Sequence, residues 1–125
     1  MTQVKDMIDE KLDFALAEQL GWVNAWDGIR LLWLDGKTNE FRGKVTDWHP
    51  STDPAASLEV QAKAIEVDAK MYVWNLSIVK WKDAVEPEDI DGWESINLED
   101  IGDLLTATPR ERAEAAYITL QGARE

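Results

Sequence analysis

The chain has 125 residues, of which 45% are hydrophobic, so we expect it to fold as one domain spanning residues 1–125. Its formal net charge of −12 disfavours direct binding to nucleic acid, because such binding needs clustered Lys and Arg to displace the counterions of the phosphates. The absence of cysteine excludes disulfides and thiolate chemistry, and with neither an export signal nor a membrane span in the sequence we expect a cytoplasmic protein.

The N-terminal part of the chain predicts a helix followed by a β-hairpin. Apolar residues recur at helical spacing from Val4 to Leu20, with charged residues between them, and Gly21 is a typical helix end. Ile29–Leu34 is a short run of large apolar residues, and turn-forming residues separate it from Phe41–Trp48. We therefore expect an amphipathic helix and then two paired strands.

The central part predicts a second helix and a third strand. Asp53 followed by Pro54 is a common combination of N-cap and first helical residue, so a helix is expected to begin there. Met71–Trp81 alternates large apolar residues with smaller or polar ones, which predicts a central strand. The predicted buried stripe of the second helix is Ala55, Leu58, Ala62, Ile65 and Ala69.

The last part combines an acidic stretch with a final helix. Nine acidic residues and no Lys or Arg lie between Asp83 and Asp103, and we expect an exposed loop that leads into a short strand or turn. Thr108 and Glu111 form a capping-box pattern around Pro109, so a helix is expected to follow and to end near residue 121. Its predicted buried residues are Ala113, Ala116, Tyr117 and Leu120.

The order helix, two strands, helix, strand, acidic stretch and helix predicts an α/β domain. We expect a three-layer helix–sheet–helix sandwich around a small mixed or antiparallel sheet. Trp33 and Trp74, inside the predicted strands, are expected in its core.

Three segments resemble, in order, the phage ABA-sandwich domain family. Residues 12–22 (LDFALAEQLGW) resemble its N-terminal helix, residues 50–60 (PSTDPAASLEV) its Ser-Thr-Asp helix start, and residues 107–116 (ATPRERAEAA) the entry to its Ala-rich last helix. Pro54 and the acidic stretch before the last helix depart from the family pattern. The resemblance implies a bacteriophage or prophage origin and helix–sheet–helix layers, and it carries no activity or functional residue.

A catalytic or metal site has one candidate set in this sequence: Asp47, His49 and Asp53. His49 is the only histidine, and stable metal sites need three or four converging ligands, so a turn-forming His-Pro is the favoured interpretation. No serine lies in a Gly-x-Ser-x-Gly elbow. The acidic stretch does not fit a calcium loop, because Pro87 and Leu98 occupy positions that require carboxylates. We expect no catalytic residue, metal or cofactor.

The favoured functional hypothesis is a non-enzymatic phage accessory protein in the cytoplasm of a bacterial host. It would bind a host or phage protein with a basic surface, and a sharper version blocks a host nucleic-acid-binding protein by presenting carboxylates where phosphates bind. The alternatives are a small hydrolase or metal-dependent enzyme around Asp47, His49 and Asp53, and a structural or assembly component of the virion. The candidate protein-binding residues are Trp81, Glu86, Glu88, Asp89, Asp91, Trp93 and Glu94.

Overall fold

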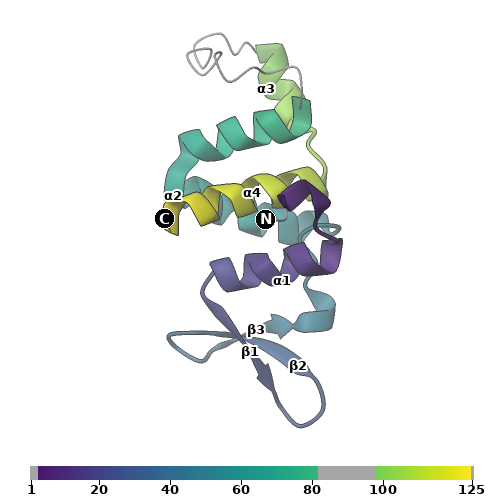
Figure 1. Ribbon diagram of the computed structural model, residues 1–125, viewed down its shortest axis with the longest axis vertical. Helices are drawn as coiled ribbons and strands as arrows, with labels where there is room; N and C mark the ends of the chain where they lie inside the picture. The colour runs from purple at the N-terminus through teal and green to yellow at the C-terminus, as the bar shows by residue number, and fades with distance from the viewer. Residues whose placement is uncertain (1–2, 82–97, 125) are drawn as a thin grey trace.

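The computed structural model of the protein describes residues 3–81 and 98–124 (Figure 1). Its elements, in chain order, are the 3₁₀ turn η1 (Val4–Asp6), α1 (Asp9–Gln19), β1 (Trp22–Trp26), β2 (Leu31–Asp35), β3 (Phe41–Lys44), the 3₁₀ turn η2 (Val45–Asp47), α2 (Pro54–Trp81), α3 (Leu98–Leu105) and α4 (Pro109–Arg124).

The fold is a small α/β fold in which helices pack on a three-stranded antiparallel sheet, which confirms the predicted α/β class and the predicted small antiparallel sheet. Figure 1 shows the sheet at one end of the long axis, with α1 next to it, α4 in the middle and α3 at the opposite end. Within residues 3–81 and 98–124, no helix has the length and apolar character that crossing a membrane requires.

The sheet differs in membership from the predicted one. Its strands follow one another in the order β1-β2-β3, and β1 was not predicted. β1 begins directly after Gly21, whose φ of +84° ends α1 in the left-handed conformation that glycine adopts without strain. The predicted strand Phe41–Trp48 is shorter, because the chain leaves β3 after Lys44 and forms η2.

The predicted strand Met71–Trp81 is wrong, since these residues form the second arm of α2. Tyr72, Asn75 and Leu76 are buried there, which is the i, i+3, i+4 spacing of a helix face. The sequence pattern did not reveal this helical face, because the alternation of large apolar residues suggested a strand and the polar Asn75 was not expected to be buried. Asn75 is accepted in the interior because its amide donates to Thr119 Oγ1 of α4 over 2.9 Å.

α2 is kinked between its two arms. Asp68 has non-helical backbone angles (φ −160°, ψ 91°), and its carboxylate caps the second arm by accepting from the Met71 N–H. Both arms pack on α4: Ser57 of the first arm accepts from Arg112 over 2.9 Å, and Asn75 of the second bonds Thr119. The kink therefore turns one long segment into two layers against the same helix.

The buried stripe predicted for the first arm of α2 is also wrong. Leu58 and Ile65 are 49% and 42% exposed, and the buried residues are instead Ala56, Ser57, Val60 and Ala64. Small residues are buried on this arm because it packs against α4, whose own buried residues include Ala113, Ala115 and Ala116. Of the stripe predicted for α4, Ala113, Ala116 and Leu120 are buried and Tyr117 packs against the core.

The helix starts of the C-terminal region follow local capping chemistry. The Thr108 N–H donates to Glu111 Oε1 and the Glu111 N–H donates to Thr108 Oγ1, which is the predicted capping box. The described end of the acidic stretch, residues 98–103, belongs to α3 and is helical rather than a strand or turn. Residues 82–97 lie outside the described part of the chain.

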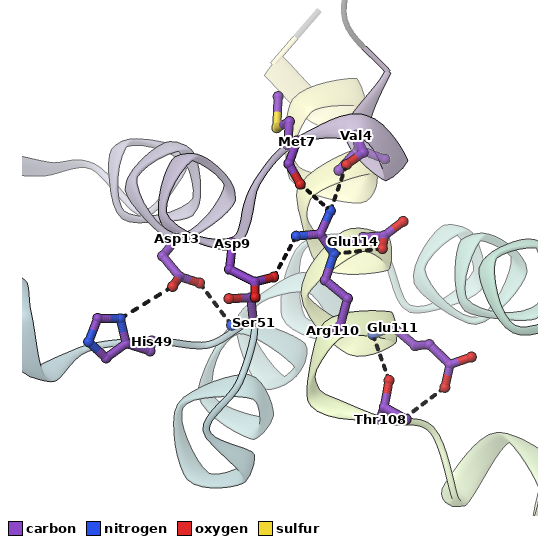
Figure 2. A network of polar contacts seen from close by, with 10 residues as sticks. All are labelled: Val4, Met7, Asp9, Asp13, His49, Ser51, Thr108, Arg110, Glu111 and Glu114. Carbon is purple, nitrogen blue, oxygen red and sulfur yellow. Dashed lines mark hydrogen bonds and ion pairs between the residues drawn. The ribbon is translucent and has the colours of Figure 1, made fainter.

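Arg110 of α4 holds the N-terminal segment in place (Figure 2). Its guanidinium donates to Asp9 Oδ1 and Glu114 Oε2, each over 2.8 Å, and to the carbonyl oxygens of Val4 and Met7. The Met7 and Val4 carbonyls lie ahead of α1, so this one side chain satisfies the backbone where the predicted continuous helix is broken.

Candidate functional site

His49, the only histidine, has both ring nitrogens next to acceptor oxygens. Nδ1 lies 3.4 Å from Asp13 Oδ2 (Figure 2), and Nε2 lies 2.6 Å from the Thr46 carbonyl oxygen. A carbonyl oxygen can only accept, so Nε2 carries a proton, and the carboxylate favours a second proton on Nδ1. The hydrogen bond to Thr46 and the contact with Asp13 raise the pKa of His49 against the opposing effect of burial.

Asp13 is a buried carboxylate on α1 that the sequence analysis did not single out. Its Oδ1 accepts a hydrogen bond from the Ser51 N–H over 2.8 Å (Figure 2). Burial raises the pKa of Asp13, although the contacts with Ser51 and His49 act in the opposite direction. The signal available in the sequence was its spacing, because Asp13 lies one turn before Leu16 and Ala17 on the buried side of the helix.

The side chains of Asp47, His49 and Asp53 are not brought together as one ligand set. Asp47 faces Lys44 at 3.8 Å, and Asp53 Oδ2 caps α2 by accepting from the backbone N–H of Ala56. In the described parts of the chain, no group of three or more His, Asp or Glu residues is arranged to hold a metal ion. The His49 ring instead bridges a carboxylate and a carbonyl group, which ties α1 to the segment before α2.

A cavity of about 310 Å³ lies beside Asp13 and His49. Phe14, Trp33 and Trp48 supply apolar walls, and the Asp13 and His49 side chains supply polar atoms. A small apolar group fits such a space, but a substrate would find neither nitrogen of His49 free to accept a proton. This arrangement favours a structural role for the pair over general base catalysis.

The predicted acidic binding surface falls mostly outside the described residues. Trp81 is its one member inside them, and its indole N–H donates to Asp103 of α3, which fixes the end of α2 to that helix. The other members, about which the structure says nothing, are Glu86, Glu88, Asp89, Asp91, Trp93 and Glu94.

One face of the sheet consists almost entirely of apolar side chains. Residues paired across antiparallel strands share a face, and Val23 pairs with Leu34, Ala25 with Leu32, and Phe41 with Leu34. We call this set the outer sheet face; its members are Val23, Ala25, Leu32, Leu34 and Phe41, with Lys44 at the margin.

The opposite, inner face of the sheet holds the contacts with the helices. Trp33 is 2% exposed and packs edge-on against Phe14 of α1, with ring centroids 4.7 Å apart. By contrast, within the described residues no member of the outer sheet face belongs to the hydrophobic core or packs against it. Val23 and Phe41 are 45% and 60% exposed, and Ala25, Leu32 and Leu34 are half-buried.

The hairpin tip is also apolar and exposed, although Trp26 and Leu31 pair with each other on the face that carries Trp33. Trp26, Ile29 and Leu31 are all exposed, and Ile29 retains 80% of its accessible surface. Sequence analysis placed the run Ile29–Leu34 in a sheet but did not indicate how many of its faces are covered. A run of large apolar residues is typical of a strand covered on both faces, and here only one is covered.

Charge separates the sheet from the rest of the chain. Residues 22–44 contain four basic and three acidic side chains, whereas the other residues contain nine basic and 22 acidic ones. Inside the sheet, Asp35 binds Arg42 at 2.9 Å and Asp27 faces Arg30 at 3.8 Å. The sheet end is therefore apolar and close to neutral. The described residues outside it, 3–21, 45–81 and 98–124, form the helical part and contain 15 acidic and eight basic side chains.

Comparison of this chain with protein-family models, with curated proteins and with solved structures finds no match. The resemblance to the phage ABA-sandwich domain stays a prediction from the three sequence segments.

Proposed function

We propose that this protein acts by binding another protein molecule through the outer sheet face, and not by catalysis. The observation that carries the proposal is a contiguous set of apolar side chains on a sheet face that no described part of the core covers. Each Å² of apolar surface that a partner removes from water stabilises the complex by about 25 cal/mol, so covering this face favours association.

The environment of His49 supports binding over catalysis. Both of its ring nitrogens are engaged, with Thr46 and with Asp13, and the buried Asp13 is itself held by Ser51. These contacts join α1, η2 and the segment before α2, and they provide partners for the polar groups of Asp13 and His49 without a substrate.

We also propose a bacteriophage or prophage origin and inhibition of a host nucleic-acid-binding protein. A bacteriophage or prophage origin rests on the three resembling segments, and with it the cytoplasm of a bacterial host. Inhibition of a host nucleic-acid-binding protein rests on the net charge of −12, which would steer a basic partner towards the helical part.

Site-specific photo-crosslinking tests the binding surface. Because the chain has no cysteine, Phe41→Cys creates a unique thiol on the outer sheet face that can carry a photoreactive label. Leu105→Cys is the matched control, since Leu105 is 78% exposed on α3 at the opposite end of the molecule.

We expect protein adducts from position 41 and none from position 105, in extract of the expressing cells and with the purified protein. Adduct formation at position 41 should be competed by excess unlabelled protein. Equal labelling at both positions, or no adduct at position 41, would contradict the proposal.

A further inference from the structure

We infer that the occupant of the outer sheet face is a second copy of this chain, packed face to face as a two-fold dimer. This inference rests on the proposed function and names its partner. The sheet end is close to neutral, while the rest of the chain has 22 acidic and nine basic side chains. Two copies that meet at any acidic surface repel each other, and the sheet end is the region where they do not.

The position of the sheet strengthens this argument. The sheet lies at one end of the long axis and α3 lies at the other (Figure 1). Packed sheets are about 10 Å apart, so two copies joined by their outer sheet faces would point their helical parts in opposite directions. The acidic groups of α3 and α4 in the two copies would then be separated by more than the Debye length, which is about 8 Å at physiological salt.

The outer sheet face also suits contact with itself. In a two-fold interface the same patch is used by both copies, so its members must be complementary to one another. Apolar side chains of similar size meet this condition without any matched charges, and here they are Val, Ala, Leu and Phe. The ion pairs Asp35–Arg42 and Asp27–Arg30 are satisfied within one copy and need no partner.

The size of the face predicts how tight the dimer is. Three strands of four or five residues form a face about 14 Å by 16 Å, given strand spacings of about 4.8 Å and a rise of about 3.3 Å per residue. Such a face is well below the roughly 800 Å² per partner of a standard stable interface. We therefore expect a weak dimer, with a dissociation constant between about 10 μM and about 1 mM.

Sedimentation equilibrium on the purified chain tests the dimer and its electrostatics. We expect the average mass to rise from 14.2 kDa towards twice that value as concentration increases through the micromolar to millimolar range. Because salt screens the repulsion between the acidic parts, association should strengthen by about two- to tenfold between about 20 mM and about 500 mM NaCl. A chain that stays monomeric at about 1 mM in high salt, or that dissociates as salt rises, overturns the inference.

Phe41→Lys identifies the surface. The substitution makes the net charge less negative, which reduces the overall repulsion. It also removes an apolar contact and places an ammonium group of each copy in the interface, and both of these changes weaken the dimer. Because each dimer contains the substitution twice, we expect association to fall by about tenfold or more. Leu105→Lys, the same charge change at the opposite end, should not weaken it.

Circular dichroism first shows that each variant is folded, and Val23→Lys, at another exposed position of the face, replaces Phe41→Lys if that variant is not. A dimer that both outer-face variants leave intact overturns the inference. The adduct mass from position 41 separates the two proposals: twice 14.2 kDa supports both, another mass alone supports protein binding and overturns the second copy, and no adduct overturns both.

Discussion

The two ends of this molecule use apolar residues in opposite ways. In the helical part, side chains such as Leu12, Leu16 and Val60 are fully buried between α1, α2 and α4. In the sheet, Trp33 is the deeply buried anchor, and Val23, Trp26 and Phe41 stay exposed. Apolar content alone therefore does not show which residues stabilise the fold, because that depends on which faces other elements cover.

The two regions also shift the pKa of their carboxyl groups in opposite directions. Burial raises the pKa of Asp13 in the helical part. In the sheet, hydrogen bonds from Arg42 and from the backbone of Thr38 and Lys37 lower the pKa of the half-buried Asp35. One region thus favours the protonated form of its carboxyl group and the other favours the ionised form.

Truncating one leucine in each region gives the largest expected contrast. Leu16→Ala should lower the free energy of unfolding by about 2–5 kcal/mol, since Leu16 is fully buried and its removal leaves a cavity. Leu34→Ala, at a half-buried position of the outer sheet face, should cost about 1 kcal/mol. Urea denaturation at protein concentrations too low for association checks both, and equal losses would show that the outer sheet face is part of the core.

Removing Arg110 tests how the helical part holds its N-terminal segment. Arg110→Met keeps the aliphatic stem but loses the bonds to Asp9, Glu114 and two backbone carbonyls. We expect a loss of about 1–3 kcal/mol, discounted for the partial exposure of the guanidinium.

The matched substitution in the sheet is Arg42→Met, which removes the exposed ion pair with Asp35 and should have a smaller effect. Chemical denaturation of both variants decides the comparison. A larger loss from Arg42→Met would mean that the sheet, and not the N-terminal segment, depends on its arginine.

Thr108→Ala probes the capping box of α4, and its effect should be about 1 kcal/mol. The Thr108 hydroxyl accepts from the Glu111 N–H, and the substitution leaves that donor without its partner. Thr108→Ser, which keeps the hydroxyl, serves as control and should retain most of the stability. Thermal unfolding of the two variants measures the difference, and identical losses would exclude the hydroxyl as the cause.

The pH dependence of stability is the smallest expected effect. The pKa of His49 is raised above 6.5 in the folded chain, so its contribution is fully present below pH 6.5 and is lost as pH rises through the folded-state pKa. The raised pKa of Asp13 acts in the same direction, starting from pH 3.8.

We therefore expect the melting temperature to fall as the pH rises above 6.5, and His49→Gln to flatten this slope while the background from the net charge remains. Differential scanning calorimetry across the range is the measurement. If the variant and the parent chain show the same slope, His49 does not contribute.

Local sequence signals determined several elements of this protein. The α/β class, the helix start at Pro54 and the Thr108–Glu111 capping box were all predictable, because capping and turn chemistry involve residues only a few positions apart. The capping hydrogen bonds form wherever the chain places them, and they need no distant partner.

Only the tertiary structure decided the elements that depend on distant contacts. In the helix formed by residues 71–81, the buried Asn75 is accommodated by a hydrogen bond to Thr119, which lies 44 positions away in the sequence. Asp13 belongs to the site because the fold brings His49 and Ser51 next to it. The outer sheet face has the same origin. Alternation along a strand shows that a sheet has two faces, but only the packing of α1 on Trp33 determines which of them is left uncovered.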